Sequence, residues 1–304
     1  MSLVECPYVE GAKYVLEFKS GTDFDEPFKP SSKLQITVLK AFQPFTISPV
    51  LKVRLDRSDP EAVIPGGSII ILKLFDSRFA TDLRQWHAVP DLTLALATEY
   101  SEFLQRESKT FEEWDAKRIQ LRDEDQDLAP LEKEAHLDTL LRSYYQCETR
   151  VYEKLIELQG RGIPKFFGQT RFVIDSFSHS SLEATVPGIL LEYIKGQSLQ
   201  ELPLQLFHES IATSALEIVS TLSDKEILNQ DVRLDNFIVP TSRIDRPVVM
   251  IDFAQCIFRG EDISDEEWYD RKAITDEEGA VGCTLRTKVG WEYRPSRRYI
   301  IRGE

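Results

Sequence analysis

Alternating apolar and polar residues dominate the chain from residue 34 to residue 75. Leu34–Leu39 and Val50–Leu55 alternate and are rich in β-branched residues, and a Pro-Gly-Gly-Ser turn at 65–68 leads into the apolar run Ile69–Phe75. Period-two alternation bounded by turn residues is typical of β-strands. The pattern predicts three successive strands in an antiparallel meander, preceded by an irregular lead-in over residues 1–30.

Residues 77–143 are predicted to form a helical insertion. The stretches 95–127 and 131–158 favour helix, with apolar residues three and four positions apart, and Pro130 separates them. Between Glu99 and Asp138 there are 13 acidic and 6 basic residues. Such a charge run is usually a solvated helix face. Two alternatives remain open: a surface for a protein partner, and a helical hairpin used for dimerisation.

The second half of the chain is predicted to mix short strands and helices. Strands are expected over 165–174 and 188–194, an amphipathic helix over 204–227, and short helices after residue 265. These last helices have acidic N-terminal ends, as the helix dipole favours. The basic end of the chain, residues 294–302, is predicted to be a solvated terminus.

A predicted β-hairpin brings polar side chains together. The apolar runs Phe237–Val239 and Val248–Ile251 flank a polar turn, which is typical of a hairpin. Antiparallel pairing would place Asn236 near Asp252, and Asp231 lies in the loop just upstream. Two carboxylates and an amide suit Mg²⁺, which completes its shell with phosphate oxygens and water. Taken alone, the motif is more typical of an ordinary hairpin with solvated acids.

The segment Asp231-Val-Arg-Leu-Asp-Asn236, followed by Asp252-Phe-Ala254, resembles the catalytic loop and metal-binding motif of the protein-kinase-like superfamily. The chain is similar to a fungal family of small kinase-like proteins. The resemblance implies an α+β, bilobal protein-kinase-like fold. Residues 31–195 would form an N-terminal lobe, an antiparallel sheet with the helical insertion 77–143. Residues 196–304 would form a small, mainly helical C-terminal lobe with catalytic loop 229–236 and metal motif 252–254.

Two charged residues lie where apolar surroundings are expected. Lys73 interrupts the third strand, and Glu148 shares a helix face with apolar residues, so each needs a partner. By the resemblance, Lys73 would hold the α- and β-phosphates of ATP and Glu148 would brace it. The main chain at Glu192 and Ile194 would bind adenine, with Leu191 at the back of the pocket. A solvent-facing lysine on an edge strand is the alternative for Lys73.

The same resemblance assigns roles to the hairpin residues. Asn236 and Asp252 would bind Mg²⁺, and Asp231 would orient the acceptor hydroxyl and accept its proton. Arg233 would neutralise charge near the γ-phosphate. The implied activity is an ATP- and Mg²⁺-dependent transfer of the γ-phosphate to a hydroxyl acceptor, either protein Ser/Thr or a small molecule.

Several departures from the kinase pattern point to an alternative function. The loop Lys40–Pro49 contains no glycine, and Asn229-Gln230 stands where His-Arg is common. Ala254 replaces a glycine, and few residues follow Asp252 for a full helical lobe. The alternative is a pseudokinase that binds nucleotide weakly or not at all and acts as an interaction scaffold.

The amino-acid composition and net charge limit the classes of partner that the protein is expected to bind. The 304 residues include 37 basic and 51 acidic ones, and the net charge of −14 repels nucleic acid and anionic membranes. The four cysteines are scattered, which favours reduced thiols over a zinc site. We find no leader-like N-terminus and no apolar run of about 18 residues. We therefore expect a cytoplasmic or nuclear protein with no nucleic-acid or membrane partner.

Overall fold

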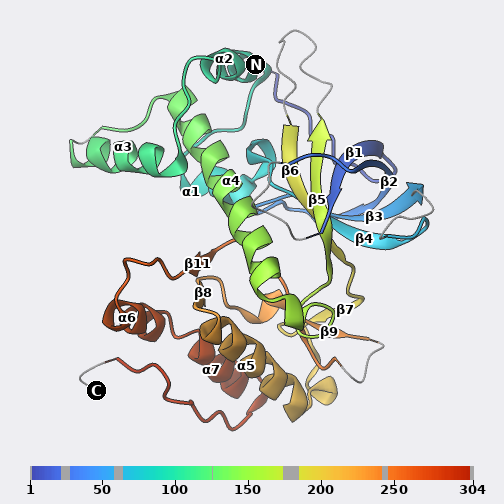
Figure 1. Cartoon of the computed structure of the whole chain (residues 1–304), viewed down its shortest axis with the longest axis vertical. Coiled ribbons are helices and arrows are strands. Elements are labelled where there is room, and N and C mark those ends of the chain that lie inside the picture. The colour runs from blue at the N-terminus through green and yellow to red at the C-terminus, as the bar shows by residue number, and fades with distance from the viewer. Residues whose placement is uncertain are drawn as a thin grey trace. The chain divides into compact units, whose positions relative to one another are not determined.

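The computed structural model describes residues 2–21, 28–57, 64–124, 126–173, 185–241 and 246–301. The chain divides into two compact units. The first contains residues 1–146 and 166–192, and the second contains residues 147–165 and 193–304. The first unit is rich in β-sheet and the second is mainly helical, which gives an α+β protein (Figure 1).

A closed barrel of six antiparallel strands forms the centre of the first unit (Figure 1). The strand order is β1-β2-β3-β4-β6-β5, and pairing of β1 with β5 closes the ring. The strands are β1 (Lys13–Ser20), β2 (Ser32–Ala41), β3 (Val50–Arg57), β4 (Ile69–Leu74), β5 (Phe166–Val173) and β6 (Thr185–Glu192). The predicted meander is confirmed as β2–β4. The irregular structure predicted for residues 1–30 is wrong for β1.

Side-chain alternation along the strands separates the barrel core from the outer face. Ile70, Leu72 and Leu74 of β4 belong to the core, together with Leu16 and Phe18 of β1. Because successive side chains of a strand point to opposite faces, Lys73 lies on the outer face of β4. Period-two burial of β1 explains why residues 13–20 form a strand: one row of apolar side chains completes the barrel interior.

The predicted helical insertion is present as several helices. They are the 3₁₀ turn Ser77–Phe79, α1 (Thr81–Trp86), α2 (Leu94–Phe103), α3 (Phe111–Asp123) and the first part of α4 (Pro130–Lys154). The single helix predicted over 95–127 is broken, because Thr110 starts α3 with a capping box that involves Glu113. Pro130 is the first residue of α4, a position where its missing N–H costs nothing.

The insertion has its own buried contacts. Trp114, Leu128 and Ala135 form a small apolar cluster. Arg84 of α1 forms a buried two-pronged ion pair with Glu134 of α4, with N–O distances of 2.5 and 3.0 Å. These contacts hold α1, α3 and α4 to one another by specific packing. The proposed role of the insertion in partner binding or dimerisation stays a prediction.

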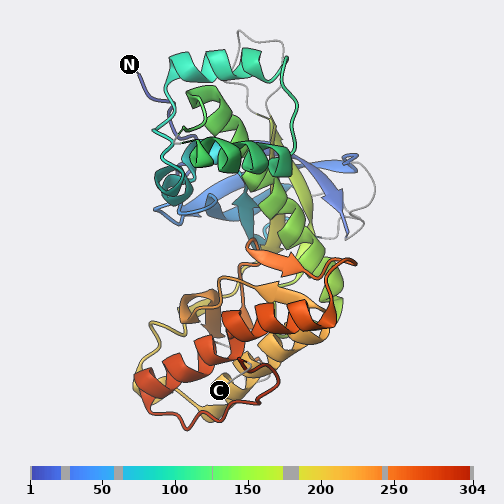
Figure 2. The same ribbon diagram turned by 90° about the vertical axis from the view of Figure 1, so that its left-hand side faces the viewer.

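The second unit combines helices with two small antiparallel sheets. The helix α5 (Glu209–Asp224) buries the predicted apolar stripe and packs beside α7 (Glu277–Val289) (Figure 2). The sheets have the orders β10-β9-β7 and β11-β8. The other elements are the 3₁₀ turns Ile156–Leu158, Leu204–Leu206 and Leu234–Asn236, the strands β7 (Gly196–Ser198), β8 (Ile227–Asn229), β9 (Phe237–Pro240), β10 (Val249–Met250) and β11 (Cys256–Phe258), and α6 (Asp265–Thr275).

In the part of the chain that the structure describes, the helices are all too short or too polar to cross a lipid bilayer.

Candidate functional site

The predicted hairpin is confirmed. In the register of β9 and β10, Phe237 pairs with Met250, and the next N–H, that of Ile251, donates to the carbonyl of Asn236 at 2.8 Å. This last bond brings Asn236 and Asp252 to the same end of the hairpin. Part of the connecting turn, residues 242–245, lies outside the described residues.

Asn236 and Asp231 are in direct contact. The buried Asn236 amide donates from Nδ2 to the Asp231 carbonyl at 2.9 Å and to Asp231 Oδ2 at 3.0 Å. Because both Nδ2 hydrogens are used in these bonds, the amide orientation is fixed. The oxygen Oδ1 of Asn236 remains as an acceptor that can bind a cation. The predicted step of five residues from Asp to Asn therefore closes a small loop.

Arg233 and Asp252 flank this loop. The exposed Arg233 guanidinium lies 3.4 Å from Asp231 Oδ2. Asp252 has φ of +65°, a left-handed conformation that is uncommon for aspartate, and its Oδ1 accepts from the N–H of Ala254 at 3.3 Å. Strained backbone of this kind concentrates at functional sites. The structure thus brings Asp231, Arg233 and Asn236 into mutual contact and sets the Asp252 backbone in a distinctive conformation.

A buried ion pair, which sequence reasoning missed, supports the strand that enters this loop. Glu277, at the start of α7, pairs with Lys272 of α6, and both side chains are almost completely buried. Glu277 Oε1 accepts from the N–H of Asn229 at 2.7 Å, and Lys272 Nζ donates to the Ile227 carbonyl at 3.0 Å. Burial raises the pKa of Glu277 and lowers that of Lys272. The sequence signal was ambiguous, because an acid in a first helical turn is usually exposed.

Asn229 continues the chain of contacts to the candidate base. Its Oδ1 accepts from the N–H of Asp231 at 2.8 Å, so the side chain holds the Asp231 backbone directly. Asn229 itself is buried. Asn229, which stands where the resembling pattern has a histidine, therefore makes a specific contact within the loop.

The last turns of α4 hold the segment that follows Asp252. The Cys147 thiol donates to the Cys256 carbonyl at 2.8 Å, and the Tyr152 and Phe253 rings meet edge to face at 5.5 Å. Burial raises the pKa of Cys147 to about 12, with the charge of Glu148 adding to the effect. Glu148 is fully buried on the predicted apolar face, whereas Glu153 is exposed.

Three predicted nucleotide-binding residues lie in the first unit. Lys73 of β4 pairs with Ile189 of β6, two positions before Leu191, so Lys73 and Leu191 share one face of the sheet. Both are buried, and Lys73 Nζ lies 5.6 Å from the centre of the Phe75 ring. Glu192 ends β6 and its side chain is half-buried.

Ile194 and Glu148 belong to the second unit. The predicted pairing of Lys73 with Glu148 joins residues of different units and stays a prediction, as does the adenine contact at Glu192 and Ile194.

The glycine-free loop between β2 and β3 is packed against α1. The side chains of Phe45 and Ile47 are buried, and the carbonyl of Phe45 accepts from the N–H and hydroxyl of Thr81, both at 2.9 Å. The carbonyl of Thr46 accepts from the N–H of Asp82 at 3.0 Å. These bonds satisfy N–H groups at the start of α1. The loop is therefore an anchored part of the first unit.

The oxygen atoms at this end of the hairpin fit Mg²⁺ in kind. Amide and carboxylate oxygens, without histidine or thiolate, are the ligands of hard divalent cations. Within the described ranges, no three His, Cys, Asp or Glu side chains cluster closely enough to hold a metal ion by themselves. A cation bound by Asn236 and Asp252 would need water and the phosphate oxygens of a substrate to complete its shell.

Comparisons with known proteins found similarity among solved structures. No family model matches the chain, and no curated protein matches it. Among solved structures it is similar to the crystal structure of the BubR1 kinase domain, with a TM-score of 0.40 and 12% identity. The match covers 84% of this chain and 53% of that chain, so this chain spans about half its length.

Proposed function

We propose that the chain is an ATP- and Mg²⁺-dependent phosphotransferase that transfers the γ-phosphate to a hydroxyl group of a protein Ser/Thr or of a small molecule. The observation that supports it is the pair of hydrogen bonds from Asn236 Nδ2 to Asp231, at the hairpin end where Asp252 also lies. This arrangement puts a candidate base beside an amide oxygen and a carboxylate suited to a cation.

Each hairpin residue has a role in this proposal. The Asp231 carboxylate accepts the proton of the acceptor hydroxyl while the hydroxyl oxygen bonds to the γ-phosphorus and the bond from that phosphorus to the ADP oxygen breaks. Arg233, 3.4 Å from Asp231, is placed to neutralise charge on the transferred group. Asn236 and Asp252 would hold Mg²⁺, which neutralises phosphate charge when bound.

The nucleotide contacts in this proposal come from Lys73, Leu191 and Glu192 of the first unit and from Glu148 and Ile194 of the second. Lys73 holds the α- and β-phosphates, braced by Glu148, and the main chain at Glu192 and Ile194 binds adenine with Leu191 behind it. The shared outer face of Lys73 and Leu191 on β4 and β6 supports this assignment. Burial of the lysine supports it as well, because a buried ammonium group is costly unless it has polar partners.

Phosphate release from Mg-ATP by the purified protein, with and without a pool of hydroxyl acceptors, tests the proposal. Asp231→Asn keeps an oxygen that can accept from Asn236 but removes the base, so we expect turnover to fall by about 10²–10⁴-fold with ATP binding retained. Asp235→Asn is the matched control, because Asp235 lies in the same loop but is exposed. Equal turnover in wild type and Asp231→Asn, or none in either, would refute the proposed catalysis.

A pseudokinase is the second candidate, and the loop between β2 and β3 favours it. That loop has no glycine, and the carbonyls of Phe45 and Thr46 are engaged at the start of α1. A nucleotide-covering loop needs free backbone N–H groups that can approach phosphates closely. Because the loop between β2 and β3 is anchored to α1 and has no glycine, its backbone N–H groups are poorly suited to approach the phosphates of a nucleotide.

Thermal unfolding with and without Mg-ATP separates the two candidates. Nucleotide at 100 times its Kd stabilises a protein by about 2.7 kcal/mol. A shift in melting temperature without turnover would indicate a nucleotide-binding pseudokinase. The absence of any shift would leave only the scaffold function.

A further inference from the structure

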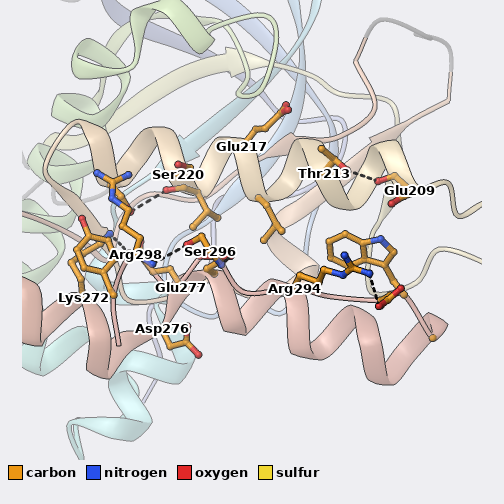
Figure 3. Close-up of a pocket in the computed structure, with 18 residues that line it drawn as sticks. Glu209, Thr213, Glu217, Ser220, Lys272, Asp276, Glu277, Arg294, Ser296 and Arg298 are labelled. Atoms are coloured by element: carbon orange, nitrogen blue, oxygen red, sulfur yellow. Dashed lines mark hydrogen bonds and ion pairs between the residues drawn. The ribbon is translucent and has the colours of Figure 1, made fainter. Parts of the chain in front are cut away.

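The segment after α7 runs back over the helices of the second unit and forms one wall of a pocket. The pocket encloses about 860 Å³ between α5, α7 and residues 290–299 (Figure 3). It lies apart from the hairpin site, and none of the predicted site residues lines it. The basic segment is exposed at residues 294–298, as predicted, and it is docked onto α5 and α7 along part of its length.

Hydrogen bonds, an ion pair and ring contacts hold this segment, and most of its polar contacts are exposed. Ser296 donates from its N–H to Glu278 Oε1 at 2.8 Å and from its hydroxyl to Glu278 Oε2. Arg298 pairs with Asp224 of α5 at 2.5 Å, with side chains 40% and 59% exposed. Ion pairs this exposed contribute about 0–1 kcal/mol. The two bonds between Ser296 and Glu278 attach the middle of the segment to α7, and farther along the Ile300 N–H donates to the Tyr269 hydroxyl at 3.0 Å.

Ser296 also has the surroundings of a kinase substrate. It is exposed, lies in non-helical chain, and is flanked by Arg294, Arg297 and Arg298. Protein kinases select substrates partly by matching charges around the target hydroxyl. Exposed segments outside helices and strands are the parts of a protein that most readily enter another enzyme's active site. We propose that Ser296 is a phosphorylation site for a separate protein kinase that recognises arginine, and that phosphate there releases the docked segment.

The reaction consumes one ATP. The Ser296 hydroxyl oxygen bonds to the γ-phosphorus, the bond from that phosphorus to the ADP oxygen breaks, and the hydroxyl proton goes to the modifying kinase's base. The product is phosphoserine and ADP. The proposal does not depend on the chain's own phosphotransfer activity.

Phosphate at Ser296 favours release because of Glu278. The modification removes the hydroxyl donor and places about two negative charges beside the Glu278 carboxylate. The neighbouring arginines can pair with the phosphate in both the docked and the released segment. Repulsion from Glu278 exists only in the docked one, so it shifts the equilibrium toward release.

Release would reach the candidate catalytic loop through contacts within the unit. Tyr299, in the docked segment, covers Lys272, with the ammonium 5.6 Å from the ring centre. Lys272 and its partner Glu277 hold the Ile227 carbonyl and the Asn229 N–H. Loss of Tyr299 would let water reach this ion pair and weaken its hold on the strand that leads to Asp231.

The test uses the full chain, ATP and a purified protein kinase that requires arginine near its target serine. We expect phosphate at Ser296 by mass spectrometry, lost in Ser296→Ala and unchanged in the control Ser220→Ala. Ser220 also lines the pocket but has no arginine next to it in sequence. Undiminished phosphate incorporation in Ser296→Ala, or none in the wild type, would overturn the site assignment.

Hydrogen–deuterium exchange of the phosphorylated protein tests release. Exchange at residues 297–301 should quicken by about tenfold, which corresponds to about 1.4 kcal/mol, with a smaller increase at residues 227–231. In Glu278→Arg the phosphate meets a cation of α7 when the segment is docked, so phosphorylation should slow exchange at residues 297–301. Unchanged exchange on phosphorylation of the wild type, or the same quickening in Glu278→Arg, would overturn the release mechanism.

Discussion

Removing one member of the buried Lys272–Glu277 pair should destabilise the second unit strongly. The two side chains are 1% and 3% exposed, so solvent does not screen the charge that is left behind. Glu277→Gln leaves the Lys272 ammonium with the Ile227 carbonyl and keeps an acceptor for the Asn229 N–H. Breaking a buried pair in this way costs about 3–5 kcal/mol. A whole domain is stable by only about 5–15 kcal/mol.

The double variant Lys272→Met, Glu277→Gln supplies the decisive comparison. It removes both charges and still keeps the acceptor for the Asn229 N–H. It should therefore lower the free energy of unfolding by much less than either single change does. Hydrogen–deuterium exchange in α5 and α7, measured at increasing denaturant concentration, gives the free energy of unfolding of this unit. If the costs of the two single changes simply add in the double variant, the claim of a coupled buried pair is wrong.

The pH dependence of Glu277→Gln gives a second check. Burial lowers the pKa of Lys272 in the folded state even with its partner present. When the pKa of a lysine is lower in the folded than in the unfolded protein, the folded state is destabilised at low pH, where the lysine is charged. The free energy of unfolding then rises as the pH increases from the folded pKa to the unfolded pKa of about 10.4. The variant should therefore regain stability relative to wild type as the pH rises from 7 toward 10. A constant difference would mean that Lys272 is not left charged and buried.

Three further predictions concern the scaffold. Burial lowers the pKa of His136 to about 4, so the free energy of unfolding should fall by up to about 3 kcal/mol as the pH drops from 6.5 to 4. His136→Gln should flatten that profile, and an unchanged profile would contradict it. Trp114→Ala should cost the insertion about 3–5 kcal/mol, measured by exchange in α3, whereas the exposed Ile119→Ala should cost under about 0.5 kcal/mol. A Cβ at Gly196 would lie 2.2 Å from the Val239 carbonyl oxygen, so Gly196→Ala should destabilise β7 by about 1–3 kcal/mol. The control Gln197→Ala changes an exposed neighbour and should have a smaller effect, and equal effects of the two changes would refute the close approach.

The sequence predicted the elements whose patterns are local. The meander β2–β4 follows from alternating residues, and the hairpin of β9 and β10 follows from two apolar runs around a polar turn. The burial of Glu148 with Val151, Tyr152 and Leu155 follows from helical spacing. In each case the residues that decide the structure lie within a few turns or one hairpin of one another.

Long-range pairings could not be predicted in the same way. The alternation of β1 was visible in residues 13–20, but closure of the barrel depends on pairing with β5 about 150 residues later. The Lys272–Glu277 pair shows the same limit: an acid at the start of α7 satisfies the helix dipole, and only tertiary packing turns it inward. The contact of Asn229 with the Asp231 backbone likewise requires the folded loop.

The most direct test of the proposed nucleotide site is calorimetric titration of the purified chain with ATP, with Mg²⁺ and with a chelator. We predict binding that requires Mg²⁺ and that Asp252→Asn weakens by at least about tenfold, while the control Asp235→Asn binds as wild type does. Binding that is indifferent to Mg²⁺ and to Asp252→Asn, or no binding to the folded wild type, would contradict the claim that Asn236 and Asp252 form a metal–nucleotide site.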